Sequence, residues 1–287
     1  MAHARRQAAC YPEGMLRRRA VPVAFALITG CLGLVPAPDE PLSLGVTNDG
    51  VLHEGRSLPD RGEGYVRARP GEATRFGTPR LVSALEGAAA AVAGAFPGSA
   101  PVRIGDLSFP GGGRHHRHGS HRTGRDADVL FYVTDPSGRS REGRGWLAYN
   151  RFGYAVDRRE GGAPELFLFD DARNWHFVRT LLLEEDWAVQ WIFVSRGVKA
   201  RLLRWAETHE PDPRAIARAA FVLHQPADAS PHDDHFHVRV LCTERERAQG
   251  CRNRGPHWEW LRGSLEKGDA ALTPLDDDAL IEALMAD

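Results

Sequence analysis

Apolar residues recur at helical spacing in several segments of the chain, and each segment has a recognisable start. The clearest runs from Thr78-Pro79 through an Ala-, Leu- and Val-rich body to Phe96, and Pro97-Gly98 ends it. Threonine can cap the first turn of a helix, and proline is tolerated there because its missing N–H has no helical partner. The same signals predict three more helices: one capped by Asp170 or Asp171 and running to about Leu183, one capped by Ser195 over residues 198–208, and one from Asp212-Pro213 to about Leu223.

Short apolar runs bounded by turn residues predict strands between these helices. They cover residues 101–107, 128–133, 166–169, 187–194 and 235–241, with a further strand-like piece around residues 146–154. Residues 31–75 are rich in Pro, Gly and charge, which predicts a linker followed by irregular structure and a hairpin. Modest strands that alternate with helices indicate an α+β fold, in which helices pack on one side of an antiparallel sheet.

The first thirty residues have the pattern of an export signal. Basic Met15-Leu-Arg-Arg-Arg19 precedes an apolar run over residues 20–28, and Ile28-Thr-Gly-Cys31 follows. A charged segment before a short apolar run is typical of a secretory signal. Residues 28–31 also resemble the bacterial lipobox, whose cysteine is acylated and becomes the mature N-terminus. We expect export to the periplasm and lipid attachment at Cys31, with the start at either Met1 or Met15. The alternative is an ordinary signal peptide with an incidental cysteine.

Composition narrows the class of protein further. The net charge is −1 and 42% of residues are hydrophobic, which is ordinary for a globular domain and gives no footprint for nucleic-acid binding. No apolar stretch after residue 30 is long enough to span a bilayer, so we expect a soluble exported domain. With Cys10 upstream of the signal and Cys31 reserved for lipid, Cys242 and Cys251 remain as a pair, and an oxidising compartment predicts a disulfide between them.

Two distant stretches together predict a metal site: His118-Gly-Ser-His121-Arg-Thr-Gly124-Arg-Asp126-Ala-Asp128 and His232-Asp-Asp-His235-Phe-His237. A catalytic zinc typically takes three protein ligands and leaves the fourth position for water. A turn at Gly124 can fold His121 back toward Asp128, and these two residues can supply two ligands. The His-Phe-His element can supply the third, because side-chain alternation in a strand puts both of its imidazoles on one face.

The remaining histidines of the two stretches are then available for acid–base work, and the pattern is that of a hydrolase. His115 and His116 lie in the Pro110-Gly-Gly-Gly loop, where we expect them to be solvated and not to bind metal. The alternative to a metal site is a pair of Arg- and His-rich surface loops. A lone His-x-His would favour that alternative, whereas two matching elements disfavour it.

These residues resemble the penicillin-insensitive murein endopeptidases, a branch of the lysostaphin-like and D-Ala-D-Ala-type zinc metallopeptidases. The resemblance runs from about Leu44 to Cys251, and the motifs that carry it are Arg75-Phe-Gly-Thr-Pro79, Ile104-Gly-Asp106, Pro110-Gly-Gly-Gly113, His118-Gly-Ser-His121 and His235-Phe-His-Val-Arg239. It implies Zn²⁺ bound by His121, Asp128 and His237, with His118, His232 and His235 as accessory active-site histidines. It also implies hydrolysis of peptidoglycan cross-links, chiefly the D-alanyl–meso-diaminopimelyl bond, without a nucleophilic serine.

The resemblance completes the predicted organisation: a signal with an upstream extension over 1–30, the linker and irregular part over 31–75, a zinc metallopeptidase domain over 76–265 and a tail over 266–287. The lipobox-like cysteine and the tail lie outside the family pattern. Within the site, His235 is the expected general base, and a protonated His118 or His232 is expected to stabilise the oxyanion.

Two other functions remain open. One is a D-Ala-D-Ala dipeptidase or carboxypeptidase with the same zinc geometry, although such enzymes usually carry Glu where this chain has Asp234. The other is a peptidoglycan-binding lipoprotein without turnover, which the intact set of ligands disfavours.

Overall fold

The computed structural model describes residues 40–159, 162–227 and 229–263. The predicted export signal, Cys31 and the tail over 266–287 lie outside the described residues, and the statements on them stay predictions. Within the described part, no helix combines the length and the apolar character needed to cross a membrane.

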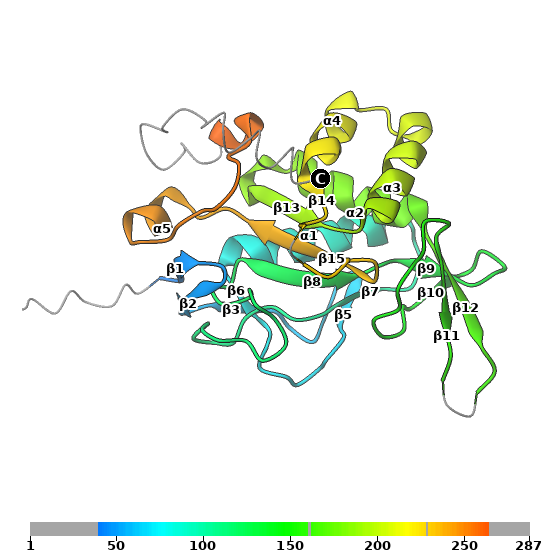
Figure 1. Cartoon of the computed structure of the whole chain (residues 1–287), viewed down its shortest axis with the longest axis horizontal. Coiled ribbons are helices and arrows are strands. Elements are labelled where there is room, and N and C mark those ends of the chain that lie inside the picture. Colours follow the sequence, from blue (N-terminus) through cyan, green and yellow to red (C-terminus); the bar gives the residue numbers. More distant parts are fainter. Residues whose placement is uncertain (1–39, 160–161, 228, 264–287) are drawn as a thin grey trace, which may run out of the picture. The chain divides into compact units, whose positions relative to one another are not determined.

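A seven-stranded sheet forms the centre of the described chain, in the order β14-β13-β15-β8-β7-β5-β4 (Figure 1). Its strands are β4 (Arg61–Gly62), β5 (Tyr65–Arg67), β7 (Val102–Ile104), β8 (Asp126–Leu130), β13 (Val189–Phe193), β14 (Leu223–His224) and β15 (His235–Val240). The pairs β5–β7 and β13–β14 are parallel. The other four pairs are antiparallel, so the predicted antiparallel sheet is confirmed in its main part.

Smaller sheets flank the large one. They are the hairpin of β1 (Leu42–Val46) and β2 (Asp49–His53), the pair β3 (Arg56–Ser57) and β6 (Phe76–Gly77), and a four-stranded sheet of β10 (Ser140–Arg141), β9 (Val133–Thr134), β12 (Glu165–Phe169) and β11 (Tyr154–Asp157). The region before residue 75 therefore holds the expected hairpin and, beyond expectation, two strands of the large sheet.

The strand-like piece predicted around residues 146–154 is wrong in its placement, because β11 begins only at Tyr154. The Asn150 side chain accepts hydrogen bonds from the backbone N–H groups of Phe152 and Tyr154, and it closes a turn there. A turn closed by an asparagine side chain competes with extended pairing.

The predicted helices are confirmed, together with their caps. They are α1 (Pro79–Ala95), α2 (Asp171–Leu183), α3 (Arg196–His209) and α4 (Pro213–Val222), followed by a short α5 (Glu244–Ala248) and the 3₁₀ turns Glu185–Trp187 and Glu259–Leu261. The side chains of Thr78, Asp170, Ser195 and Asp212 each accept a hydrogen bond from the first turn of the helix that follows.

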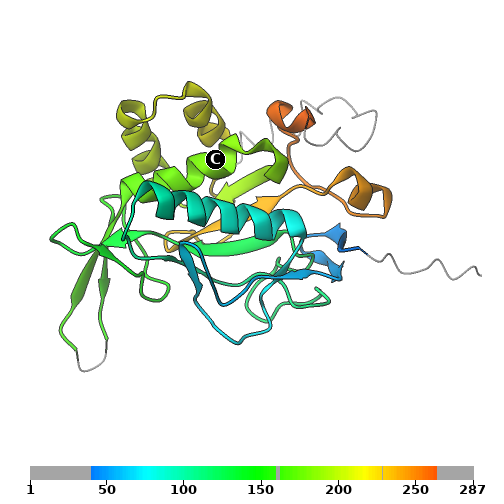
Figure 2. The same ribbon diagram turned by 180° about the vertical axis from the view of Figure 1, so that it is seen from behind.

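Helices α1 and α2 lie across one face of the large sheet, as Figure 2 shows. Phe236 of β15 points to that face: it is fully buried, and its ring lies 4.7 Å from Phe131 and 6.4 Å from Phe177 of α2, measured between centroids. Its neighbours His235 and His237 point to the opposite face, as the alternation predicted. The fold is α+β, with the apolar core on one side of the sheet and the histidines on the other.

Candidate metal centre and the groove beside it

The register between β8 and β15 brings the two predicted elements together. The strands are antiparallel, with His237 opposite Asp128 and Arg239 opposite Asp126. Residues directly opposite in an antiparallel pair project to the same face, so these four side chains share one surface. Segments more than a hundred residues apart thus contribute to one cluster.

The loop before β8 returns His121 to the same cluster. His121 has φ +62° and Gly124 has φ +70°, so two positions of this loop adopt left-handed backbone. A side chain at position 124 would begin 2.7 Å from Leu52, which restricts the turn to glycine. His121 is fully buried, and its Nε2 lies 3.3 Å from Asp128 Oδ1. Left-handed backbone at a non-glycine residue costs energy and is commonest at functional sites, and the predicted turn at Gly124 is confirmed.

Two hydrogen bonds fix which ring nitrogen of each histidine faces Asp128. His121 Nδ1 lies 3.2 Å from the carbonyl oxygen of Leu107, which can only accept, so Nδ1 carries a proton, and in the neutral ring Nε2 is bare. His237 Nε2 lies 3.1 Å from Asp126 Oδ1, which leaves Nδ1 bare at 3.5 Å from Asp128 Oδ1. Both rings therefore direct a lone pair at the Asp128 carboxylate.

Asp126 is a supporting residue to which sequence reasoning assigned no role. Its Oδ1 holds His237, and its Oδ2 accepts a hydrogen bond from the backbone N–H of His121 at 3.3 Å. It thus supports two candidate ligands at once. The spacing Asp126-x-Asp128 indicated this role, because side chains two residues apart on a strand project from the same face.

The charge balance singles out Asp128 among the buried carboxylates of the site. Asp106, Asp126 and Asp128 are all fully buried. Asp106 pairs with arginines 69 and 117, and Asp126 pairs with Arg239 at 2.6 Å. Asp128, in contrast, has ion-pair contacts only with imidazoles among the described residues, and neither of its oxygens makes a hydrogen bond.

The pKa values agree with a site built for a cation. Burial raises the pKa of Asp128, but His121 and His235 outweigh that effect and hold it well below its usual range. Burial also lowers the pKa of His237 to about 4, against the opposing effect of Asp126, so this imidazole is neutral. Burial lowers the pKa of His121, but Asp128 outweighs that effect and raises it, so in this cluster the His121 imidazole balances the Asp128 charge. A buried carboxylate without a permanent counter-charge is costly. A bound cation would take over that role, and an ionised carboxylate with neutral imidazoles is the donor set that zinc takes. The residues present fit a zinc ion.

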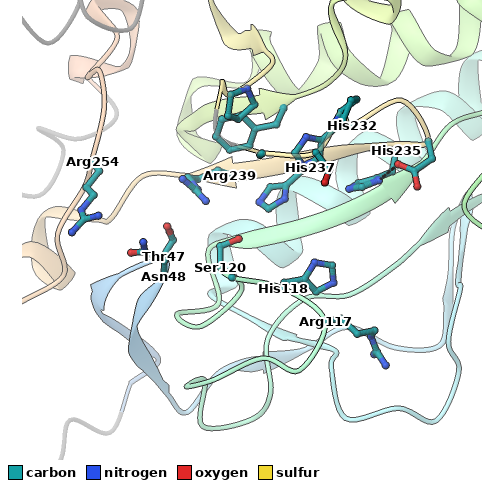
Figure 3. A pocket seen from close by; sticks show the side chains of 17 residues that line it. Thr47, Asn48, Arg117, His118, Ser120, His232, His235, His237, Arg239 and Arg254 are labelled. Carbon is teal, nitrogen blue, oxygen red and sulfur yellow. Dashed lines mark hydrogen bonds and ion pairs between the residues drawn. The ribbon is translucent and has the colours of Figure 1, made fainter. Parts of the chain in front are cut away.

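The other predicted histidines line a groove of about 740 Å³ that opens onto this cluster (Figure 3). His118 Nε2 lies 3.1 Å from Asp106 Oδ2 and 3.4 Å from Asp128 Oδ2. His235 Nδ1 lies 2.5 Å from Asp234 Oδ1, and its Nε2 lies 3.3 Å from Asp128 Oδ1. The ring centroid of His232 lies 5.1 Å from that of His235. All six residues of the predicted site are therefore neighbours.

Burial divides the histidines into two groups. His121 does not line the groove, and His237 is 6% exposed, whereas His118, His232 and His235 are only partly buried and form part of the groove wall. This arrangement matches ligands at the floor and accessory groups above them. Two other sets of three residues also have potential ligand atoms that all lie within 4.8 Å of one another: His118-His121-Asp128 and His232-His235-His237. Distance alone therefore does not identify the three ligands.

The two wall histidines nearest each other differ in protonation. Burial lowers the pKa of His235, but Asp128 and Asp234 outweigh it and raise that pKa to about 10. Burial together with His237 and His235 lowers the pKa of His232 to about 3. His232 is therefore a neutral ring, which disagrees with the expectation that a protonated His232 stabilises an oxyanion.

The expectation that His115 is solvated is wrong. His115 is 4% exposed, and its ring packs against His118 at 4.7 Å and His116 at 5.1 Å between centroids. Burial, with His121 and His118 nearby, lowers its pKa to about 4. The glycine-rich loop folds back so that the His115 ring lies 5.3 Å from Phe109 and 5.7 Å from His121 between centroids, and local composition gave no sign of this packing.

The predicted disulfide is present, between Cys242 and Cys251 with their Cα atoms 6.1 Å apart. It closes the loop that follows β15 and contains α5. Backbone hydrogen bonds then tie this loop to β1, from Gly45 N to the Gly250 oxygen at 3.1 Å and from Arg252 N to the Gly45 oxygen at 2.9 Å. The N-terminal hairpin and the disulfide loop thus meet beside the groove.

Comparison with known proteins gives one matching family and one curated relative. Residues 43–259 match the sequence profile of a family described as penicillin-insensitive murein endopeptidase. A curated protein of Haemophilus influenzae, named penicillin-insensitive murein endopeptidase, is 29% identical to this chain over 229 residues, which cover 77% of this chain and 71% of that protein.

Proposed function

The chain belongs to the family of penicillin-insensitive murein endopeptidases, and from this premise we propose that it is a zinc-dependent hydrolase of peptidoglycan cross-links. The specific bond proposed is the amide between D-alanine and meso-diaminopimelate. The name of the Haemophilus influenzae relative supports the reaction class. The observation that carries the zinc is the buried Asp128, which lacks a cationic side-chain partner other than imidazole among the described residues.

We assign the metal ligands to His121 Nε2, the Asp128 carboxylate and His237 Nδ1. Leu107 and Asp126 hold the opposite nitrogens of the two rings, which fixes their tautomers and orientation. The three ligands would hold a zinc ion, whose chemistry there would be to polarise the scissile carbonyl and to make water a stronger nucleophile near neutral pH.

His235 is proposed to move the proton. Asp234 accepts the Nδ1 hydrogen, which leaves Nε2 directed into the site and stabilises the imidazolium once it forms. Nε2 can take a proton from the attacking water and pass it to the departing amine nitrogen, as general acid–base catalysis requires. A cation on Asp128 would offset one of the two charges that raise the His235 pKa, and Asp234 would remain as the other.

The two other wall histidines take different roles. His118 lies between Asp106 and Asp128 at hydrogen-bond distance from the former, so it is the proposed donor to the developing oxyanion. The His232 ring is neutral, and its Nδ1 makes no hydrogen bond with the described residues. We therefore propose that His232 binds the substrate peptide.

Digestion of purified sacculi tests the function directly. The protein should remove cross-linked muropeptide dimers, lose this activity with a chelator and regain it with Zn²⁺. The matched control is Asp128→Asn, which keeps the shape of the side chain and removes its charge. Loss of terminal D-alanine without loss of dimers would instead identify a carboxypeptidase, and an unchanged muropeptide profile would identify a binding protein.

We also propose export to the periplasm with lipid attachment at Cys31, motivated by the sequence of the first thirty-one residues. Stable anchoring needs more than one acyl chain, which a bacterial lipoprotein carries. Mass spectrometry of the mature N-terminus should find an acylated cysteine. An unmodified N-terminus downstream of position 31 would contradict the proposal.

A further inference from the structure

The groove continues beyond the histidines to a second, positively charged end. Thr47, Asn48, Arg239 and Arg254 line this end, and Figure 3 shows them on the side of Ser120 away from His232 and His235. The metal centre accounts for none of these four side chains as ligands or as acid–base groups. They come from the β1–β2 turn, from β15 and from the segment after Cys251.

Arg239 presents the free part of its guanidinium to this end of the groove. It lies two residues after His237 on β15 and therefore on the same face of the sheet. Its Nε donates to Asp126 at 2.6 Å, and its guanidinium carbon lies 5.0 Å above the Phe193 ring, so the group is held in place. The two Nη atoms make no hydrogen bond with any described residue and are left to face the groove.

Arg254 adds a second guanidinium, which has no ion-pair partner among the described residues. Its side chain is exposed. Its backbone, by contrast, is fixed, because the Arg254 carbonyl oxygen accepts a hydrogen bond from Gln190 Nε2 at 2.8 Å. The charge is thus carried on a positioned segment at the rim.

The surroundings leave this end positive. A small adjoining cavity is lined by arginines 125, 239, 252 and 254 together with Val46, Thr47 and Gln190, and by no acidic residue. Asp126, the carboxylate in contact with this group, is already paired with Arg239. At the other end of the groove the opposite holds, because Arg117 is neutralised by Asp106 and Glu72.

We propose that Arg239 and Arg254 form a subsite for a carboxylate of the cross-linked peptide, which rests on the function proposed above. In a D-alanyl–meso-diaminopimelyl cross-link, the carbon that bears the leaving nitrogen also bears a free carboxylate. Two residues of a strand span about 6.6 Å, so the Arg239 guanidinium can reach a carboxylate attached close to the bond that is cut beside His237. The guanidinium fork binds a carboxylate with two parallel hydrogen bonds, and the subsite would thereby select the diaminopimelyl carboxylate.

The test removes one partner at a time, from the enzyme and from the substrate. Muropeptide dimers are prepared with the diaminopimelyl carboxylate free, with it amidated, and with the D-glutamyl carboxylate amidated instead. Each is cleaved by the wild-type zinc enzyme and by Arg254→Gln, Arg254→Lys and the control Arg204→Gln, an exposed arginine of α3 that does not line the groove. Arg239 is left intact, because its loss would also release Asp126.

The wild type should lose about tenfold or more in kcat/KM when the diaminopimelyl carboxylate is amidated, the effect of one charge-assisted hydrogen bond. Arg254→Gln should lose a similar factor on the free dimer and little more on the amidated one, because the partners act as a pair. Arg254→Lys should recover part of the loss, and Arg204→Gln should behave as wild type. Zinc content should be equal in all four proteins.

Three outcomes would overturn parts of this picture, and they are distinguishable. Equal cleavage of the free and the diaminopimelyl-amidated dimers by the wild type would refute the subsite and leave the endopeptidase function intact. A loss confined to the D-glutamyl-amidated dimer would refute the assignment to diaminopimelate. Failure to cleave any dimer would contradict the endopeptidase function itself, and the subsite with it.

Discussion

The two ends of the groove are built in opposite ways. The histidine end rests on β8 and β15 in the interior of the large sheet, and its carboxylate and ligand side chains are fully or almost fully buried. The arginine end shares β15 through Arg239, but its other side chains come from a hairpin turn and from the segment after the disulfide loop, and Arg254 at its rim is exposed. Ligands must keep a fixed geometry, which favours rigid elements, whereas contacts with a long polymeric substrate can lie on loops.

The arginine end also has its own means of support. The Cys242–Cys251 disulfide closes its loop, and Arg125, which is almost fully buried, bonds both Ser43 Oγ at 3.0 Å and Asn253 Oδ1 at 3.0 Å. Sheet register holds the side chains of the histidine end in position, whereas cross-links between loops hold those of the arginine end. If this division is correct, substitutions at one end should affect metal and chemistry, and those at the other should affect substrate binding.

The largest effect is expected from His237→Ala. It removes a ligand and leaves the other groups of the floor exposed to water, so zinc and activity should both be lost. Elemental analysis of the purified variant measures the metal, and His209→Ala on α3 serves as a control with one histidine fewer. Stoichiometric zinc in His237→Ala would refute the assignment of this ligand.

His235→Ala should separate chemistry from metal binding. Three protein ligands satisfy a catalytic zinc, so the variant should retain near-normal zinc and fold. It should cleave dimers at least about a hundredfold more slowly, within the range of a positioned general base. If zinc disappears, His235 is a ligand; if activity is unchanged, the base is His232 or Asp234.

Asp126→Asn should weaken the metal site without dismantling it. Asparagine keeps the size of the side chain but removes the charge that orients His237 Nε2 and supports the His121 backbone. Loss of such a partner typically costs about 10–100-fold in metal affinity, measured by competition with a chromophoric chelator. An unchanged affinity, with the near-ultraviolet circular dichroism of the wild type, would show that sheet register alone positions the rings.

Asp234→Asn should shift the pH dependence of the reaction. A general base must be deprotonated to act, so activity falls as the pH drops through its pKa. The Asp234 carboxylate helps to raise the pKa of His235, and its removal should move the acidic limb of kcat/KM to lower pH by roughly one unit or more. A limb that stays in place, or moves to higher pH, would contradict the Asp234–His235 pair.

The smallest effect on chemistry is expected from the double variant Cys242→Ser/Cys251→Ser. A disulfide that closes a short loop contributes about 2–3 kcal/mol to the free energy of unfolding in the chain-entropy model, which denaturant titration should detect. Because Arg254 follows the closed loop by three residues, KM for cross-linked dimers should rise while zinc content and kcat stay close to those of the wild type. Loss of zinc would show that the two ends of the groove are not independent.

Local features of the fold were determined by the sequence alone. The helix caps at Thr78, Asp170, Ser195 and Asp212 were predictable because a cap is a contact between residues two or three apart. The common face of His235 and His237 followed from strand alternation, and the turn at Gly124 from backbone freedom. The cysteine pair followed from counting the cysteines that remained after the signal.

The tertiary structure alone decided which residues contact the predicted site residues and strands. Three such features join segments far apart in the chain: the pairing of Asp126 with His237, the entry of β4 and β5 into the large sheet, and the gathering of arginines at one end of the groove. The burial of His115 depends on how its own loop folds back. The local pattern of apolar and polar residues shows which face of a strand is buried, but it does not show which distant segment packs beside that strand. A buried charge acquires its function from the neighbours that compensate it, and only the folded chain determines which neighbours those are.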